Sequence, residues 1–287
     1  MIKVNGHKIE LETFGDNTLK CKTIEPSWLV EDQLGAKVGD CATLTWAYDN
    51  DAELFAVCCL AKELHEETDT VYLELPYIPH ARQDRKVSGR LFTLKVFAEI
   101  INSLNFKRVY VLDPHSDVST ALIDRVRIVD VGATFYDPFY DPAMKCDAIM
   151  FPDAGAAKKY GLYDFGDKPI IIGNKHRNKD GRIESYELMN FPDGVESVCI
   201  IDDIVSYAGT HVAAARALKE KGVKKVILIV SHCEYNIAKG DAFNSIDTVY
   251  TTDSLLDINT TSIDIDIASS LKEAVRKGKL VINQYFR

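Results

Sequence analysis

Short apolar runs alternate with longer amphipathic segments along most of the chain, and this alternation predicts an α/β protein. The apolar runs contain four or five residues, which is typical of buried strands. The longer segments repeat apolar residues every three or four positions, which is typical of helices packed on a sheet. Strands are predicted at residues 71–75, 108–112, 148–151, 169–172, 198–201 and 226–230, and helices at 52–66, 91–104 and after residue 210.

The order of strands and helices starts again near residue 133, so the 287 residues are expected to form two α/β domains. The predicted domains are 1–132 and 133–287, each built on a mostly parallel sheet. The alternating Ile-Asp-Ile-Asp-Ile segment at 263–267 predicts one more strand, followed by a last helix that ends at Gly278.

Composition narrows the class of protein. The hydrophobic fraction of 46% and charged fraction of 27% are those of a globular domain. The formal charge of −9 argues against non-specific binding to nucleic acid or to a membrane surface. No apolar run could span a bilayer and no signal-peptide pattern begins the chain, so we expect a cytoplasmic protein with no membrane partner. The seven cysteines form no C-x-x-C pair and are expected to be free thiols.

The segment 198–230 carries the most informative pattern. An apolar strand runs into Asp202 and Asp203, a turn of small residues ends at Gly209 and Thr210, and a helix and a second strand follow. Backbone N–H groups at such a helix start suit a phosphate, and the two acids suit a sugar diol or a metal beside it. The alternative is that Asp203 is a turn residue and Thr210 a helix N-cap. The full pattern favours a ribose phosphate.

A second polar segment, 76–86, follows directly after a predicted strand. It contains Arg82, Arg85 and Lys86, interleaved with Gln83 and Asp84. Most runs of this kind are solvated surface loops. Two prolines and two aromatic residues would stiffen this loop, however, and arginine suits both phosphate recognition and stacking on a base.

Together these segments resemble the ribose-phosphate pyrophosphokinases, or phosphoribosyl pyrophosphate synthetases. The P-Y-x-x-x-A-R-Q-D-R-K pattern at 76–86 carries the match, and the remaining motifs, from Phe14 to Thr210, fall in the family's order. The resemblance implies an ATP site with a contribution from a neighbouring subunit, a metal site, a catalytic pair on a mobile loop and a ribose-phosphate loop. The implied ATP-binding residues are Phe14, Asp16, Arg82, Gln83, Asp84, Arg85 and His115, and the implied metal ligands are His115 and Asp153. The implied catalytic pair is Lys175 and Arg177. The implied ribose-phosphate-binding residues are Asp153, Asp202, Asp203, Ser206, Tyr207, Ala208, Gly209 and Thr210.

The same resemblance implies two tandem phosphoribosyltransferase-like domains and a reaction. The β,γ-pyrophosphoryl group of ATP would pass to the anomeric hydroxyl of a ribose 5-phosphate, with Mg²⁺ as cofactor and AMP as the second product. A homo-oligomer, either a dimer or a multiple of dimers, and no nucleic-acid partner are expected. From the residues alone His115 would be read as structural, because a histidine is an unusual magnesium ligand.

Two departures from the family pattern leave alternatives open. Thr18 stands where the family usually has Glu, and Ser206-Tyr207 stands where it has Asp-Thr. The larger Tyr207 is expected either to point outward or to open the loop for a 5-substituted ribose such as ADP-ribose. A phosphoribosyltransferase and a catalytically inactive, synthetase-associated binding subunit are the other candidate functions.

Overall fold

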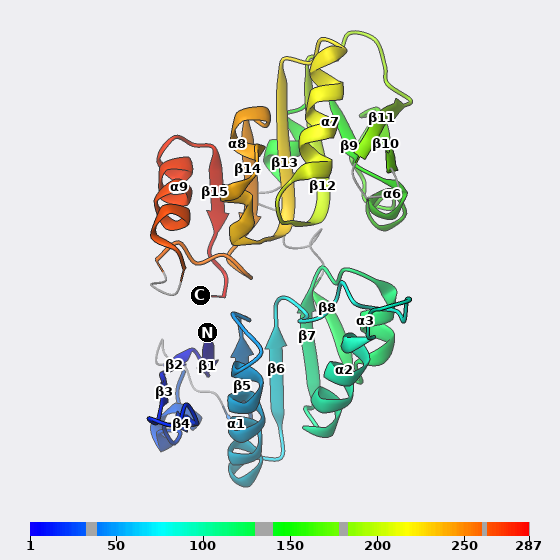
Figure 1. Cartoon of the computed structure of the whole chain (residues 1–287). Coiled ribbons are helices and arrows are strands. Elements are labelled where there is room, and N and C mark those ends of the chain that lie inside the picture. Colours follow the sequence, from blue (N-terminus) through cyan, green and yellow to red (C-terminus); the bar gives the residue numbers. More distant parts are fainter. Residues whose placement is uncertain (33–38, 130–139, 178–182, 260–262, 287) are drawn as a thin grey trace. The chain divides into compact units, whose positions relative to one another are not determined.

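The computed structural model describes residues 1–32, 39–129, 140–177, 183–259 and 263–286. They form two compact units, one mainly Met1–Asp130 and the other Val131–Tyr285 (Figure 1). Each unit is an α/β sheet structure, as predicted. The predicted boundary after residue 132 falls within 130–139, outside the described residues, and stays a prediction.

The first unit is built on a six-stranded sheet of order β2-β1-β5-β6-β7-β8, in which β5 to β8 are parallel. Because β5 to β8 follow one another in one direction, right-handed crossovers place their helices on one face. The unit also contains a short hairpin, β3–β4, and a 3₁₀ helix, η1. The elements are β1 (Ile2–Val4), β2 (His7–Ile9), β3 (Leu11–Thr13), β4 (Leu19–Cys21), η1 (Pro26–Leu29), β5 (Ala42–Trp46), α1 (Glu53–Glu67), β6 (Val71–Leu75), α2 (Thr93–Ser103), β7 (Arg108–Leu112), α3 (Asp117–Leu122) and β8 (Val126–Val129).

The second unit is built on a seven-stranded sheet of order β11-β10-β9-β12-β13-β14-β15. All neighbouring strands are parallel except the β10–β11 hairpin. The elements are α5 (Tyr140–Met144), β9 (Ala148–Phe151), α6 (Ala154–Tyr160), β10 (Ile170–Arg177), β11 (Ile183–Met189), β12 (Ser197–Val205), α7 (Gly209–Glu220), β13 (Lys225–Cys233), η2 (Tyr235–Lys239), α8 (Ala242–Ser245), β14 (Thr248–Thr252), α9 (Ile265–Arg276) and β15 (Leu280–Asn283).

Both faces of this second sheet are covered. One apolar core contains residues of α7 and α9 together with Ile200 of β12. The other contains residues of α6 together with Ile201, the next residue of the same strand. Successive residues of a strand point to opposite faces, which explains this division. From β9, the next strand in the sequence, β10, is added on one side of the sheet, whereas β12, β13 and the later strands are added on the other side. The order in which strands are added therefore reverses between β9 and β12.

Three sequence predictions are corrected. The alternating segment 263–267 is not a strand, because Asp264 caps α9 by accepting hydrogen bonds from the N–H groups of Asp266 and Ile267. The predicted basic loop at 174–177 is instead the end of β10, because it pairs with β11. The acids Asp202 and Asp203 lie within β12 rather than in the loop after it, since β12 stays paired with β13 as far as Val205.

Candidate active site

Predicted site residues of the second unit gather where the order of its strands reverses. Asp153 follows β9 directly, and Asp202 lies toward the end of β12. These two strands are neighbours, paired through Met150 and Ile200. In open α/β sheets, ligands bind beyond the carboxyl ends of the strands at such a reversal. The topology therefore supports the predicted place of the site.

The predicted ribose-phosphate loop, residues 206–210, leads from β12 into the start of α7. Its Ala208 is the N-cap residue, with a left-handed backbone (φ 61°) and no side-chain capping hydrogen bond. Thr210 is therefore not the N-cap, and the first backbone N–H groups of α7 lack a capping side chain. A Cβ atom added at Gly209 would meet nothing within 4 Å, so there is open space at this turn. The geometry suits the approach of an anion.

Tyr207 is the most exposed large side chain of this loop, with 56% of its surface accessible. The main chain of Tyr207 packs closely against Gly240. A Cβ atom added at Gly240 would lie 2.3 Å from the Tyr207 carbonyl oxygen. Close packing at Gly240 thus fixes the main chain while the ring remains open to solvent. Ser206 is half-buried and Ala208 is buried.

The paired acids lie in different surroundings. Asp202 shares the orientation of Ile200, toward α7, and its Oδ2 is 2.9 Å from Nε2 of the buried His211. Burial raises the pKa of Asp202, and the hydrogen bond with His211 opposes that rise. Asp203, the next residue of β12, is itself buried.

Asp153 is joined to the β10–β11 hairpin by an ion pair. Nζ of Lys175 lies 2.7 Å from Oδ2 of Asp153, and Oδ1 of Asp153 caps α6 by accepting the N–H of Ala156 at 3.0 Å. Burial acts to raise the pKa of Asp153, but the hydrogen bond from Lys175 and the N–H of Ala156 outweigh it, so the pKa is lowered. The structure therefore brings Lys175 and Asp153 together.

Tyr186 of β11 supports this arrangement from the neighbouring strand. Its hydroxyl donates to the carbonyl oxygen of Pro152 at 2.7 Å, and it faces Lys175 across the hairpin. The ring fits only because residue 173 is glycine, since a Cβ atom there would lie 2.0 Å from the Tyr186 hydroxyl. Arg177 ends β10, and its side chain lies outside the described part of the structure.

In the first unit, the predicted ATP-binding loop follows β6. His80, in a left-handed conformation (φ 63°), lies 3.2 Å from Asp51 at the start of α1, which anchors the loop. Arg82 and Gln83 are exposed. Asp84 is half-buried, and its Oδ1 is 4.0 Å from Nε of Arg85. The predicted phosphate-binding side chains are therefore displayed on an anchored loop.

His115 and the Phe14–Asp16 turn occupy other parts of the first unit. His115 is exposed and follows β7, two residues after the buried Asp113. Phe14 is 53% exposed and lies on the β3–β4 hairpin. Asp16 shapes the turn of that hairpin by accepting hydrogen bonds from the backbone and hydroxyl of Thr18.

Comparison with known proteins decides the family. A ribose-phosphate pyrophosphokinase of Vibrio cholerae is 31% identical over 219 residues, which cover 71% of this chain and 68% of that protein. The chain belongs to the ribose-phosphate pyrophosphokinase family. Its members are pyrophosphoryl transferases, so the predicted class of enzyme is confirmed. No protein-family model matches the chain.

Two further comparisons fit this assignment. A ribose-phosphate pyrophosphokinase of Thermosipho africanus is 30% identical over 175 residues, 57% of this chain and 53% of that protein. The crystal structure of a phosphoribosylpyrophosphate synthetase from Mycobacterium smegmatis matches with a TM-score of 0.71 at 19% identity, covering 96% of this chain and 86% of that one. The structural match confirms the predicted fold of two tandem phosphoribosyltransferase-like domains.

The pyrophosphokinase resemblance implies magnesium, and the predicted ligands fit an ion that arrives with a nucleotide. Mg²⁺ commonly keeps water and substrate phosphates and takes only one or two protein ligands. Within the described ranges, no group of three or more His, Cys, Asp or Glu side chains could hold a metal. Asp153 has a carboxylate, and His115 is an exposed residue.

Two residues that were not predicted from the sequence contact the candidate site of the second unit. His211 binds Asp202, and Tyr186 binds the residue before Asp153. A histidine on the inward face of a helix, directly after a suspected phosphate loop, is a signal for His211. No pattern in the sequence distinguishes Tyr186 from other strand residues.

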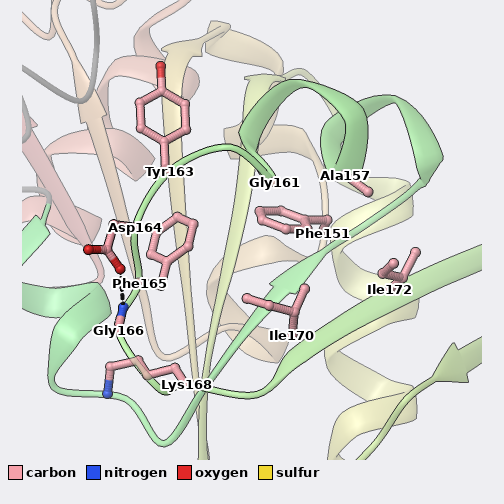
Figure 2. Close-up of a pocket in the computed structure, with 10 residues that line it drawn as sticks. All are labelled: Phe151, Ala157, Gly161, Tyr163, Asp164, Phe165, Gly166, Lys168, Ile170 and Ile172. Carbon is pink, nitrogen blue, oxygen red and sulfur yellow. Dashed lines mark hydrogen bonds between the residues drawn. The ribbon is translucent and has the colours of Figure 1, made fainter.

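A separate cavity lies on the α6 side of the sheet (Figure 2). Its volume is about 240 Å³, and Phe151, Tyr163, Phe165 and Lys168 are among the residues that line it. None of its lining residues is a predicted site residue. In the part of the chain that the structure describes, no helix is long and apolar enough to cross a membrane.

Proposed function

We propose that this protein transfers the β,γ-pyrophosphoryl group of ATP to the anomeric 1-hydroxyl of a ribose 5-phosphate unit. The hydroxyl oxygen forms a bond to the β-phosphorus of ATP, and the bond from that phosphorus to the α–β bridging oxygen breaks. AMP leaves with the bridging oxygen, and the hydroxyl proton passes to solvent. Catalysis of this kind depends mainly on alignment and on stabilising charge at phosphoryl oxygens.

One observation carries this proposal. An uncapped helix start, the Asp202–His211 pair and the Asp153–Lys175 pair all lie at the strand reversal of one sheet. The helix start suits the 5-phosphate and the carboxylates suit sugar hydroxyls. Lys175 supplies a cation for the transferring phosphates, and we assign the same role to Arg177.

The first unit is proposed to bind ATP through its anchored loop after β6. Arginine presents a planar fork of donors that matches phosphate oxygens, and it stacks on bases. His115 is proposed as a metal ligand in this unit and Asp153 as a metal ligand in the second unit. The Mg²⁺ that accompanies ATP would offset charge on the phosphates. Phe14 and Asp16, on the exposed hairpin, are proposed to reach the ATP site of a neighbouring subunit, which requires a homo-oligomer. The proposed ATP contacts of the loop are Arg82, Gln83, Asp84 and Arg85.

An assay of AMP release tests this function against its alternatives. The protein is incubated with Mg-ATP, with and without ribose 5-phosphate or ADP-ribose. AMP formation that depends on the sugar supports the pyrophosphokinase. A phosphoribosyltransferase would release pyrophosphate from phosphoribosyl pyrophosphate when given a nucleobase. A binding subunit would form no AMP and release no pyrophosphate. Either the phosphoribosyltransferase result or the binding-subunit result would overturn the proposal.

A second acceptor, ADP-ribose, is favoured by Tyr207. A ring that is 56% exposed beside an open helix start is available to stack on the adenosine of a 5-substituted ribose. The product would be ADP-ribose pyrophosphate. The test compares ribose 5-phosphate with ADP-ribose for the wild type and for Tyr207→Thr, with Tyr163→Thr as the control. We expect the first substitution alone to shift preference toward ribose 5-phosphate, and an unchanged preference would exclude this acceptor.

A further inference from the structure

His211 occupies an inward-facing position in the first turn of α7. Its side chain is 6% exposed. It is the one polar residue among the buried positions of α7, which otherwise hold Val212, Ala214, Ala215 and Leu218. Burying a polar side chain costs free energy unless its hydrogen bonds are made. A specific contact is therefore needed to explain a histidine here.

That contact is with Asp202. Nε2 of His211 lies 2.9 Å from Oδ2 of Asp202. The other oxygen, Oδ1, accepts the N–H of Asp203 at 3.0 Å. An ionised carboxylate only accepts hydrogen bonds, so Nε2 is the donor. Both oxygens of Asp202 are thus held by the protein. An ionised carboxylate has about four lone-pair sites, so capacity to accept hydrogen bonds from a ligand remains.

The other nitrogen of His211 shows that packing alone does not account for this residue. Nδ1 is buried and has no hydrogen-bond partner among the residues that the structure describes. An unpaired buried polar atom is destabilising, and leucine would fill a similar volume without that cost. The hydrogen bond to Asp202 is the contact that histidine makes at this position and leucine could not make.

The surrounding charges give that hydrogen bond a second effect. Burial raises the pKa of Asp202, the neighbouring Asp203 acts in the same direction, and His211 acts against both. Burial raises the pKa of Tyr186 on β11, and Asp153 and Asp202 act in the same direction. His211 thus opposes the rise and favours the ionised form of the Asp202 carboxylate.

We propose that His211 is a positioning residue for the ribose acceptor, which holds the Asp202 carboxylate so that its remaining lone pairs accept hydrogen bonds from the sugar hydroxyls. This inference depends on the proposed function and adds one residue to its acceptor site. A fixed carboxylate loses less freedom on binding than a mobile one, so removal of His211 weakens acceptor binding first.

Two amide variants and one apolar variant test the role of His211. Glutamine places its amide nitrogen near the position of Nε2, whereas asparagine places it near that of Nδ1. The KM values for the acceptor and for ATP, and kcat, are measured for His211→Gln, His211→Asn and His211→Leu. His65→Leu is the control, because His65 binds a main-chain oxygen, that of Leu104, in the other unit. Thermal melting confirms that each variant is folded.

We expect the KM for the acceptor to rise roughly tenfold or more in the asparagine and leucine variants, the loss expected for one hydrogen bond to a charged group. The glutamine variant should stay within about threefold of the wild type, and the KM for ATP should change little in all of them. Equal values for glutamine and asparagine, or a rise confined to ATP, would overturn the role of His211. An inactive wild type would instead overturn the proposed function. If the leucine variant does not fold, the two amides decide the question.

Discussion

Replacing Lys175 with alanine tests the proposed catalytic role of the β10–β11 hairpin. In the structure Lys175 is paired with Asp153 at 2.7 Å, and the side chains are 26% and 34% exposed. The substitution removes a cation from the carboxyl edge of the sheet. Asp153 keeps the N–H of Ala156 and its place at the start of α6. The variant is therefore expected to fold.

The expected effect of Lys175→Ala on stability is smaller than its expected effect on turnover. A partly exposed ion pair contributes at most about 1 kcal/mol to the free energy of unfolding. A donor that stabilises charge in the transition state contributes about 2.7–4 kcal/mol, a loss of about 10²–10³ in turnover. We therefore expect Lys175→Ala to melt near the wild-type temperature while kcat falls by at least a hundredfold. The KM for ATP should change little, since the contact is needed mainly in the transition state.

The measurement is the steady-state rate of AMP release by Lys175→Ala. Lys224→Ala is the matched control. Lys224 lies in the same unit and forms an ion pair with Glu196 at 2.6 Å, away from every predicted site residue. The control should keep wild-type turnover, whereas Arg177→Ala should behave like Lys175→Ala. The reasoning is wrong if Lys175→Ala and the control have similar kcat values.

Three further predictions concern stability and assembly. Gly173→Ala should lower the free energy of unfolding by about 2–4 kcal/mol in urea titration, because the new methyl group displaces the Tyr186 hydroxyl; a change below about 0.5 kcal/mol would contradict it. The pKa of Asp153 is lowered below 3.8, so its pair with Lys175 stabilises the fold above that pH and is lost as the pH falls through the lowered value. The stability deficit of Lys175→Ala should therefore shrink between pH 6 and pH 2.5, and a constant deficit would exclude the linkage. Finally, Phe14→Ala should reduce activity in a protein that sediments as a dimer or larger assembly; an active monomer would refute this.

The sequence predicted those elements whose limits are set by strong local signals. The strand 71–75 is ended by Pro76, and 108–112 is followed by Asp113, whose left-handed backbone leaves the strand. Both strands have the predicted bounds. The position of the segment 206–210 between a strand and a helix was also predictable, because an apolar strand, small residues and an amphipathic helix specify one βαβ unit.

Features that depend on partners distant in the sequence were not predictable in this way. The residues at 174–177 look like a charged loop until β11 is placed beside them. The alternation at 263–267 fits a strand, but the capping hydrogen bonds of Asp264 favour a helix. The pairing of His211 with Asp202 depends on how α7 packs on β12, which no local pattern specifies.

The arrangement of charges supports the proposal that an acidic protein binds anionic substrates at this site. Asp153, Asp202 and Asp203 lie near one edge of the second sheet, in a chain of formal charge −9. Asp153 is paired with Lys175, and Asp202 is held by His211. The uncapped N–H groups of α7 then present a local positive potential beside them. Because interactions between charges weaken with distance and with screening by salt, these near neighbours outweigh the net charge of the chain. The proposed binding of phosphate at this edge therefore depends on Asp153 and Asp202 keeping these partners.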